Sequence, residues 1–588
     1  MNHETLTQTP SRPEVLAPGG SLEAIVGAME NGANAVYVGV GNLNARRRAS
    51  NLSLAELPAV VSYVHERGGR LYVALNVPLQ ESTVDEAVET LAHIWMSGAD
   101  AVILRDPLLM EWSSAHCPGL DIHASTQAGV HDVASASRFQ KLGCTRVVLA
   151  RECSLHQIAE IHRALPELEL ESFFFGAMCF GVSGQCLLGE AVGGRSGNYG
   201  SCLQACRLPY FTATGEPLGT VLSMKDLDYF RRIKELMQAG VVSLKIEGRM
   251  KSPAWVGCLS HWASKAALQW QEGGLSASQY EAFDREVGIL FSRPRTDAFL
   301  DNVRDAAVLI DSAGPGHRGF SVPFVSRLRG RNVSVEFTTP VPLSIRDGLM
   351  LTRKGSKGEL RTEPFSIPIF WDPRGKERKV VDPGERARVE IPGVAEVVAV
   401  AIHSCQALRQ RYEEKVASIA RQVLGKEERG KIESVKMDGT TLHLAVTTGR
   451  HTYECIREDV SWEPARTPGG TLDAWQRLFP DAELSVPEAT YVNPKLLKGI
   501  RREALEEAKS ARETHLAEVL AELKAYVASQ ILAFLPPDKQ LVREGAAALS
   551  MVVGLPTGEI RTSGGDRFVL EERKGTTVVR WIPKDESV

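Results

Sequence analysis

The fold is decided by one stretch near the start of the chain, PEVLAPGGSLEAIVGAMENGANAVYVGV, which runs from Pro13 to Val40. Two short apolar runs, at 15–17 and 35–40, enclose a segment that begins with Ser21 as an N-cap and ends in a glycine-containing turn. Both runs are continuously apolar, as expected for strands that helices cover on both faces. The stretch therefore predicts a β-α-β unit with parallel strands.

The same pattern recurs along the first half of the chain. We count eight apolar runs, at 15–17, 35–40, 71–75, 101–104, 120–123, 146–149, 170–175 and 241–246. Eight β-α repeats favour a closed (β/α)8 barrel of the TIM type. The alternative is an open doubly wound sheet, and the lack of a G-x-G-x-x-G after the first run weighs against it. We predict the α/β class, with a TIM-like barrel at 13–300 that follows a flexible tail at 1–12.

The rest of the chain has a different character. Short alternating strands with Gly and Pro turns predict a small β-barrel domain at 301–402, and a helix followed by strands predicts an α+β module at 403–488. Asn493 and Pro494 form an N-cap and N1 pair for a long amphipathic helix. This helix and the short terminal strands predicted in MVVGLP, FVLEER and TTVVRWI make up 489–588. The apolar positions that we assign to this helix are Leu496, Ile500, Leu505, Leu516, Leu520, Leu523 and Val527.

Composition excludes several classes of protein. The 588 residues are 43% hydrophobic and 24% charged, with a formal net charge of -4, which is typical of a globular chain and not of a disordered or fibrous one. We find no long apolar window and no secretory signal, so we expect a cytoplasmic protein without a membrane partner. Any RNA binding must depend on local patches, such as the part between Arg327 and Lys379, which has 12 Lys and Arg against 6 Asp and Glu. A solvated surface explains that stretch equally well.

Polar residues follow the predicted strands, at the positions where a TIM-like barrel carries its functional side chains. They are Arg46, Asn76, Arg105, His123, Gln127, Glu152, Glu247 and Arg249. Glu247 and Arg249 flank a glycine in LKIEGRM, so they could anchor a small anionic ligand and position its proton, or form a structural ion pair at the barrel rim. His123 could act as a general base, although a single His at a strand end is more often structural.

Four of the ten cysteines form a cluster with the spacing C-x6-C-x15-C-x3-C, at Cys179, Cys186, Cys202 and Cys206. The glycines of GGRSGNYG allow the chain between them to fold back on itself. Four thiolates match a 4Fe-4S cluster or a tetrahedral zinc site, and the spacing favours iron because structural zinc usually binds two close pairs. Unligated or redox-active thiols are a third interpretation. The loop follows the seventh run, which would place the site over the barrel mouth.

Several sequence motifs also carry a family resemblance. In order, PEVLAPGGSLEA, AVYVGVGNLNARRRASNLS, HASTQAGV, GAMCFGVSGQC, CLQACRLPY, SMKDL and LKIEGRMKS resemble the collagenase-like peptidase family U32 over about residues 13–270. The later regions look like the extra domains of longer members, which include a ribosomal RNA cytidine hydroxylase branch. The stretch FSRPRTDAFL at 291–300 departs from the expected form.

The resemblance implies a barrel with an iron-sulfur cluster and oxygen insertion into RNA bases or quinone precursors, with a requirement linked to prephenate. By motif position, the four clustered cysteines would ligate the cluster, and the pocket would be lined by Arg46, Lys245, Glu247 and Arg249. We assign catalysis to Lys245, His123, Glu247 and Arg249. We assign substrate binding to Arg46, Asn76, Arg105, Gln127 and Glu152.

The leading hypothesis is an iron-sulfur-dependent RNA hydroxylase that acts on a cytidine of large-subunit ribosomal RNA, with prephenate as a small organic acid co-substrate. A U32-type peptidase is the first alternative, although no G-x-S-x-G, H-E-x-x-H or P-loop motif supports a serine hydrolase, a zincin or an NTPase. The second alternative is a non-catalytic RNA-binding or assembly factor with a structural cluster. The sequence does not indicate an oligomeric state.

Overall fold

The computed structural model describes residues 12–47, 49–212, 214–355, 358–425, 430–464, 469–487, 490–534, 558–561, 567–573 and 576–582. Its contacts divide the chain into one unit that ends at Glu518 and a second that begins at Val519. The tail expected at 1–12 lies outside the described residues, apart from Arg12. Within these ranges, no helix combines the length and the apolar character needed to cross a membrane.

Eight parallel strands form a closed barrel. They are β1 (Glu14–Gly19), β2 (Ala35–Gly39), β3 (Arg70–Leu75), β4 (Ala101–Leu104), β5 (Asp121–Ala124), β6 (Arg146–Val148), β7 (Glu169–Gly176) and β11 (Val241–Glu247). Strand β11 pairs in parallel with both β1 and β7, and this double pairing closes the ring. Each predicted run overlaps one of these strands, so the predicted TIM-like barrel is confirmed and the open-sheet alternative is wrong.

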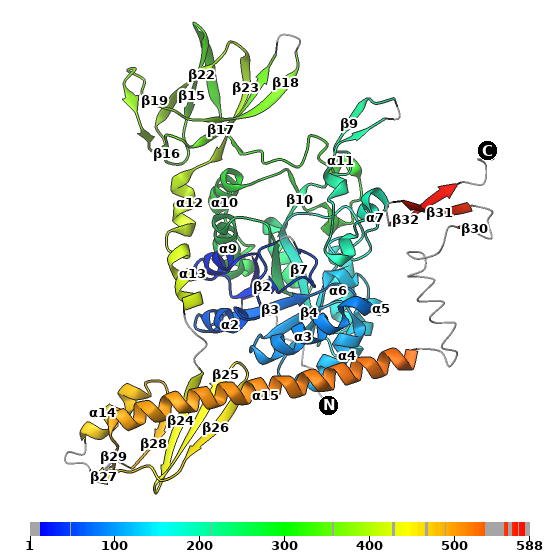
Figure 1. The fold of residues 1–588 in the computed structure, drawn as a ribbon. Coiled ribbons are helices and arrows are strands. Elements are labelled where there is room, and N and C mark those ends of the chain that lie inside the picture. Colours follow the sequence, from blue (N-terminus) through cyan, green and yellow to red (C-terminus); the bar gives the residue numbers. More distant parts are fainter. Residues whose placement is uncertain are drawn as a thin grey trace, which may run out of the picture. The chain divides into compact units, whose positions relative to one another are not determined.

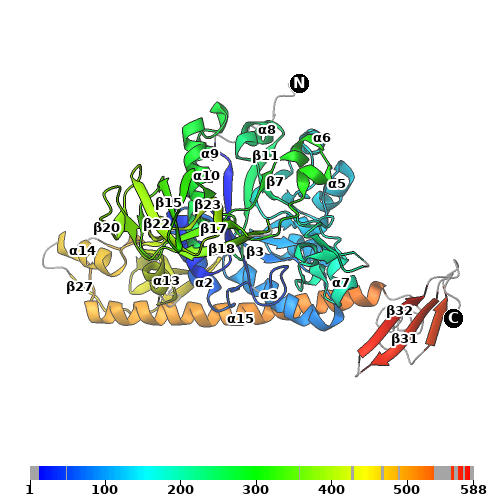
Figure 2. The ribbon, with the colours of Figure 1, turned by 90° about the horizontal axis from the view of Figure 1, so that it is seen from above.

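Helices surround the barrel strands, as Figure 2 shows for α5, α6, α8 and α9. They are α1 (Leu22–Glu30), α2 (Leu57–His65), α3 (Val84–Met96), α4 (Pro107–His116), α5 (Val133–Lys141), α6 (Leu155–Ala164), α8 (Ile233–Gln238), α9 (Pro253–Leu268) and α10 (Ala277–Leu290). The predicted N-cap is present, because the Ser21 hydroxyl accepts a hydrogen bond from the backbone N–H of Ala24 at 3.2 Å. Helix α1 buries seven of its nine residues against the barrel, including Ile25 and Val26.

Between β7 and β10 (Asp226–Asp228) the chain leaves the barrel and forms a long excursion, residues 177–222. It contains α7 (Leu188–Gly193), two short 3-10 turns (Gly197–Tyr199 and Ala205–Arg207) and the hairpin of β8 (Tyr210–Phe211) and β9 (Pro217–Gly219). In Figure 1 it is the cyan to green segment that carries the labels α7 and β9. All four clustered cysteines lie on this excursion.

The unusual stretch FSRPRTDAFL packs beside the strand that follows the excursion. It provides β12 (Arg295–Thr296), which pairs with β10, while β10 runs antiparallel to β7. Arg293 forms an ion pair with Asp226 at 2.6 Å, and Arg295 forms one with Asp228 at 3.0 Å. The arginines that make this stretch unusual therefore anchor it to the strand that follows the excursion.

The next region consists of short strands in two main sheets. They are β13 (Phe320–Ser321), β14 (Phe324–Arg329), β15 (Asn332–Thr338), β16 (Leu343–Ser344), β17 (Gly348–Lys354), β18 (Leu360–Ser366), β19 (Phe370–Trp371), β20 (Glu377–Arg378), β21 (Val380–Val381), β22 (Arg386–Pro392) and β23 (Glu396–Ser404). The sheet orders are β13-β23-β17-β18 and β14-β15-β22-β19-β20. Helices α12 (Gln406–Glu413) and α13 (Val416–Gly425) then return to the barrel and pack against α9 and α1.

A second small core lies beyond α13. The strands β24 (Lys431–Asp438), β25 (Thr441–Thr448), β26 (His451–Arg457) and β28 (Glu483–Ser485) form a sheet that shares a core with α14 (Gly469–Leu478) and the start of α15 (Pro494–Phe534). The Asn493 side chain accepts a hydrogen bond from the backbone N–H of Lys495 at 2.9 Å, as expected of the predicted N-cap. A two-stranded ladder joins β27 (Glu463–Pro464) and β29 (Thr490–Tyr491).

The second unit contains an antiparallel sheet of β30 (Gly558–Arg561), β31 (Arg567–Arg573) and β32 (Thr576–Ile582). Two of these strands lie where the sequence predicted them, in FVLEER and TTVVRWI. The third predicted strand, MVVGLP, lies outside the described residues.

Candidate active site

Glu247 ends β11 and lies at the mouth of the barrel, between two arginines. Its Oε2 contacts Arg151 Nη2 at 3.0 Å and its Oε1 contacts Arg46 Nη2 at 3.3 Å. Burial raises the pKa of this carboxyl, but the charges of Arg46, Arg151 and Lys245 outweigh burial and bring it below its ordinary value. Glu247 is therefore ionised at neutral pH and holds both guanidinium groups in place.

A cavity opens around this carboxylate. Its walls are Tyr37, Ala45, Arg46, Ala74, Asn76, Ile103, Ser125, Thr126, Gln127, Arg151, Phe173, Lys245, Glu247 and Arg249. The structure thus brings together six of the residues predicted from the sequence. Among these, Asn76 accepts a hydrogen bond from the backbone N–H of Ala45 at 2.9 Å and donates one to Ser125 at 3.1 Å. These bonds fix the loop that carries Arg46.

Arg249 does not pair with Glu247 among the described residues. Its guanidinium instead donates to the side-chain oxygens of Asn44, at 3.0 Å, and Asn51. Burial lowers the pKa of Arg249 to about 10, and its Nε has no hydrogen-bond partner within the described part of the chain. The rim ion pair considered from the sequence is therefore formed by different arginines, and Arg249 keeps a buried donor free.

Lys245 lies on β11 two residues before Glu247, deeper in the barrel interior. Its ammonium contacts Glu171 Oε1 at 2.6 Å and lies 4.4 Å from the centre of the Tyr37 ring. Glu171 also contacts Arg146 at 3.3 Å, and Arg146 contacts Glu14 at 2.5 Å. A chain of alternating charges thus runs down the barrel interior from Lys245.

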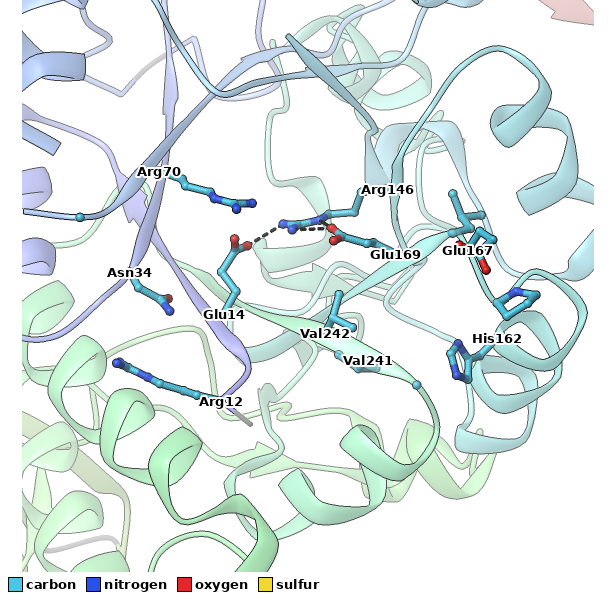
Figure 3. A pocket seen from close by; sticks show the side chains of 14 residues that line it. Arg12, Glu14, Asn34, Arg70, Arg146, His162, Glu167, Glu169, Val241 and Val242 are labelled. Carbon is cyan, nitrogen blue, oxygen red and sulfur yellow. Dashed lines mark hydrogen bonds and ion pairs between the residues drawn. The ribbon is translucent and has the colours of Figure 1, made fainter. Parts of the chain in front are cut away.

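Arg146 belongs to the opposite end of the barrel, where the strands begin. Figure 3 shows the pocket there, with Arg146 between the carboxylates of Glu14 and Glu169. The contact with Glu169 measures 2.7 Å. Because carboxylates already surround the Arg146 guanidinium, we interpret this end as structural, as is usual for the N-terminal face of such barrels.

His123 lies inside the barrel and does not belong to the cavity lining at the mouth. Its ring meets the edge of the Tyr72 ring at 4.7 Å between centroids. Burial lowers the pKa of His123 well below its ordinary value, and the charges of Arg146 and Lys245 lower it further. The imidazole is thus neutral, and its role as a general base stays a prediction.

Two further predicted residues contact the cysteine loop. Glu152 accepts hydrogen bonds from the backbone N–H of Ser183 at 2.9 Å and from its hydroxyl at 2.8 Å. Arg105 donates to the carbonyl of Gly184 at 3.1 Å. In this structure the hydrogen bonds of both side chains hold the loop at the barrel mouth.

The four clustered cysteines are free thiols on this loop. Cys179 is exposed, and Cys186, Cys202 and Cys206 are partly buried. Burial raises the pKa of Cys206, and the neighbouring Cys179 and Cys202 raise it further, so these three thiols lie close enough to interact electrostatically. Glu247 raises the pKa of Arg46, and Cys179 and Cys202 add to that effect. The cysteine loop therefore lies beside the Glu247 site.

The four thiols fit a metal centre in donor type. The backbone packs closely against one of them, because a Cβ at Gly181 would lie only 2.7 Å from Cys186 Cβ and 2.9 Å from its Sγ. In the ranges that the structure describes, however, no three His, Cys, Asp or Glu side chains are placed to hold a metal ion. Assembly of a four-cysteine centre would require the sulfur atoms to move together.

Comparison with known proteins gives the family. A sequence profile described as peptidase family U32 matches residues 20–308. A Helicobacter pylori (strain J99) protein named "tRNA hydroxylation protein P" is 33% identical over 303 residues, which cover 49% of this chain and 71% of the relative. This chain belongs to peptidase family U32. The resemblance inferred from the motifs is confirmed.

Other U32 relatives carry different names. The Escherichia coli (strain K12) "23S rRNA 5-hydroxycytidine C2501 synthase" is 34% identical over 357 residues, which cover 58% of this chain and 53% of that protein. A Porphyromonas gingivalis (strain W83) protein named "Collagenase" is 28% identical over 305 residues, which cover 49% of this chain and 73% of that protein. The chain thus spans about half the length of the E. coli relative.

Sequence reasoning missed several residues of this U32 site. Arg151 is one of the two partners of Glu247, and it directly precedes Glu152, which was selected instead. Asn44 and Asn51 hold Arg249, and Ser183 links Glu152 to the cysteine loop. The position of Arg151, just after β6, was the available signal. The other three lie within loops, where the sequence offers no periodic pattern.

Proposed function

We propose that this U32 chain is an RNA-modifying enzyme that hydroxylates an RNA base, with a cytidine of large-subunit ribosomal RNA as the first target. The observation that carries the proposal is that relatives 33% and 34% identical to it are named for hydroxylation of tRNA and for synthesis of 5-hydroxycytidine in 23S rRNA. Such a reaction converts a C–H bond of the base into C–O–H: the oxygen donor supplies one oxygen atom and is reduced by the two electrons that the base loses. A target base must leave its stack to reach a barrel mouth.

The arginines support a small organic acid as co-substrate. Arg151 and Arg249 line the cavity, and the Nε of each is buried and has no hydrogen-bond partner among the described residues. Buried donors of this kind are costly unless a ligand satisfies them, and guanidinium groups favour carboxylates. Glu247 offsets only part of the positive charge around it. We propose that these groups bind the carboxylates of prephenate, the acid that the family resemblance implies.

We propose further that Cys179, Cys186, Cys202 and Cys206 hold a 4Fe-4S cluster. Support comes from four free thiols on one loop, three of which interact electrostatically beside Arg46. When bound, such a cluster would exchange single electrons with the site. The measurement is anaerobic purification followed by a visible absorption spectrum and analysis of iron, sulfide and zinc. A colourless protein that contains zinc would contradict this assignment.

The function itself is tested on RNA from a strain that lacks this chain. We expect mass spectrometry of ribosomal and transfer RNA to show one lost hydroxylation, which the wild-type gene restores and the Glu247→Gln variant does not. RNA without any lost modification would overturn the proposal. Degradation of gelatin or casein by the purified protein, abolished by Glu247→Gln, would instead support a peptidase.

A further inference from the structure

The excursion 177–222 exposes an unusual number of large apolar side chains. They are Phe180, Val182, Leu187, Val192, Tyr199, Leu208, Phe211, Leu218 and Val221, each between 36% and 65% exposed. Elsewhere in the described residues up to 300, only Met250 and Leu268 are large apolar residues with comparable exposure. A concentration of exposed apolar groups on a soluble domain marks an interaction surface. We call these nine residues the excursion surface.

Arginines lie beside the segment of this surface that carries Tyr199. Tyr199 is close enough to Arg105 to raise the pKa of its guanidinium, which burial lowers. The next residue, Gly200, packs on Arg47 so closely that a Cβ there would lie 2.8 Å from Arg47 Cγ. Arg47 itself is exposed. Tyr199 therefore lies near Arg105, and the backbone that follows it contacts Arg47.

Phe180 is the other exposed aromatic ring beside the clustered cysteines. It is 44% exposed and directly follows Cys179. The same part of the loop lies at the barrel mouth, because Arg105 donates a hydrogen bond to the carbonyl of Gly184 at 3.1 Å. Exposed rings beside arginines and next to a catalytic cavity are the combination that single-stranded nucleic acids require, because bases stack on the rings and phosphates contact the cations.

We infer that the excursion surface binds single-stranded RNA on either side of the target base, with flanking bases stacked on Phe180 and Tyr199 and phosphates held by Arg47 and Arg105. This inference rests on the proposed function and adds the form of RNA that the site accepts. The target base must be unstacked to enter the mouth, so its neighbours also lose stacking partners. The aromatic rings replace those partners. A loop or an unpaired segment is therefore the substrate, and a continuous duplex is not.

The test measures binding of a fluorescent single-stranded RNA oligonucleotide and of its duplex by anisotropy, with the full chain. We expect the wild type to prefer the single strand, and Tyr199→Ala or Phe180→Ala to weaken binding about 10-fold. Tyr199→Phe keeps the ring and should bind within about 2-fold of the wild type. Tyr491→Ala is the matched control, because Tyr491 is 42% exposed but lies on β29. Circular dichroism checks the fold of each variant.

The outcomes separate this inference from the proposed function. If the wild type binds single-stranded RNA and both alanine variants bind equally well, the excursion surface is not the RNA contact, while the hydroxylase proposal stands. A preference for duplex would also overturn the inference. If the wild type binds no RNA and the deletion strain has lost no modification, both proposals fail. If the alanine variants bind RNA normally but no longer bind a protein that the wild type retains, the surface is a protein interface instead.

Discussion

At the scale of single residues, the charge of Glu247 holds Arg46 and Arg151 in position at the mouth. Glu247→Gln keeps the shape of the side chain but leaves the two guanidinium groups without their counter-charge. We expect RNA hydroxylation to fall by about 100-fold and the free energy of unfolding to fall by about 3 kcal/mol, since removing one partner of a buried ion pair leaves the other uncompensated. Mass spectrometry of the RNA and urea unfolding measure the two effects.

The matched control for this change is Glu216→Gln, because Glu216 is exposed and lies on the excursion, outside the cavity at the mouth. It should leave both quantities unchanged. Full hydroxylation by Glu247→Gln would remove this carboxylate from the proposed site.

Lys251 gives a prediction about pH. Its ammonium lies against the Phe291 ring, and burial lowers the pKa of Lys251 to about 7, with Arg293 lowering it further. In the unfolded chain the pKa is about 10.4. Between these two values the unfolded chain binds more protons, so this lysine makes the protein more stable as the pH rises from 7 toward 10. Lys251→Met should raise the melting temperature at pH 7 and flatten its rise with pH.

Lys265→Met is the comparison for Lys251→Met, because Lys265 lies beside Trp262 on α9, on the outside of the barrel. Thermal unfolding monitored by circular dichroism from pH 7 to pH 10 measures the slope. An unchanged slope in Lys251→Met would show that this lysine is charged in the folded protein.

From the sequence, only those site residues could be predicted that directly follow a strand. Arg46, Asn76 and Gln127 line the cavity because the ends of parallel strands converge at one face. His123 follows the same reasoning but lies within β5, one residue before its end, so its side chain belongs to the barrel interior. The pairing of Glu247 with Arg151 depends on how loops approach in space, and no local pattern encodes that.

At the scale of elements, the cysteine loop is positioned by close backbone contacts. Gly184 has a φ of 75°, and a Cβ at this position would overlap the carbonyl of Gln127. Gly184→Ala should therefore displace the loop from the mouth and reduce iron content and RNA hydroxylation at least about 10-fold, with a stability loss of about 1–3 kcal/mol. Iron analysis, RNA mass spectrometry and thermal unfolding measure these effects.

Gly194→Ala separates displacement of the loop from backbone strain. Gly194 lies on the same loop and has a φ of 63°, but a Cβ there meets nothing within 4 Å. This variant should lose only about 1 kcal/mol and keep its iron. Equal losses in both alanine variants would show that strain, and not the contact with Gln127, controls the loop.

Helix α15 shows where a periodic pattern misleads. The sequence placed Leu496 on the apolar face, but Leu496 is 40% exposed while Leu497 is 1% exposed and packs with Val435 and Leu444. The buried positions continue at Ile500, Ala504 and Ala508. The two alanines belong to the buried stripe, and a search for large apolar residues overlooks them.

This neighbouring pair provides its own test. Leu497→Ala should destabilise the core formed by β24, β25 and α15 by about 2–5 kcal/mol, because it opens a cavity among fully buried side chains. Leu496→Ala should cost less than about 1 kcal/mol. Urea unfolding followed by circular dichroism compares the two, and equal losses would contradict the burial of Leu497.

At the scale of the whole molecule, the barrel could be predicted because eight repeats each carry the same local signal. The barrel closes when its last parallel strand pairs with its first. The eighth parallel strand, β11, does pair with β1. Lys245 was assigned to the pocket from its motif, but its partner Glu171 was not predictable, since Glu171 lies within a strand that otherwise reads as apolar. Their pairing across adjacent strands becomes visible only in three dimensions.

The distribution of charge gives the last prediction. The chain has a net charge of -4, so RNA binding depends on local cations. We call the strands from β13 to β23 the basic β region, because they contain the basic stretch between Arg327 and Lys379. In this region Arg353, Arg378 and Arg388 each pair with a glutamate, at 2.8, 3.0 and 3.6 Å, which neutralises part of that surface. Within the described part of the chain, Arg47 and Arg105 form no ion pair with a glutamate, although Asp106 lies close enough to Arg105 to raise its pKa.

We therefore expect a shallow salt dependence, with log K falling by about 2 to 3 for each tenfold rise in salt, as for roughly three or four phosphate contacts with a single strand. Arg47→Gln should reduce this slope by about 0.7, because Arg47 lies at the mouth. Arg378→Gln should leave the slope unchanged, because Arg378 lies on the basic β region. Anisotropy titrations over a series of potassium chloride concentrations measure the slope. A slope near about -7, or a reduction in Arg378→Gln, would place the RNA on the basic β region and away from the barrel mouth.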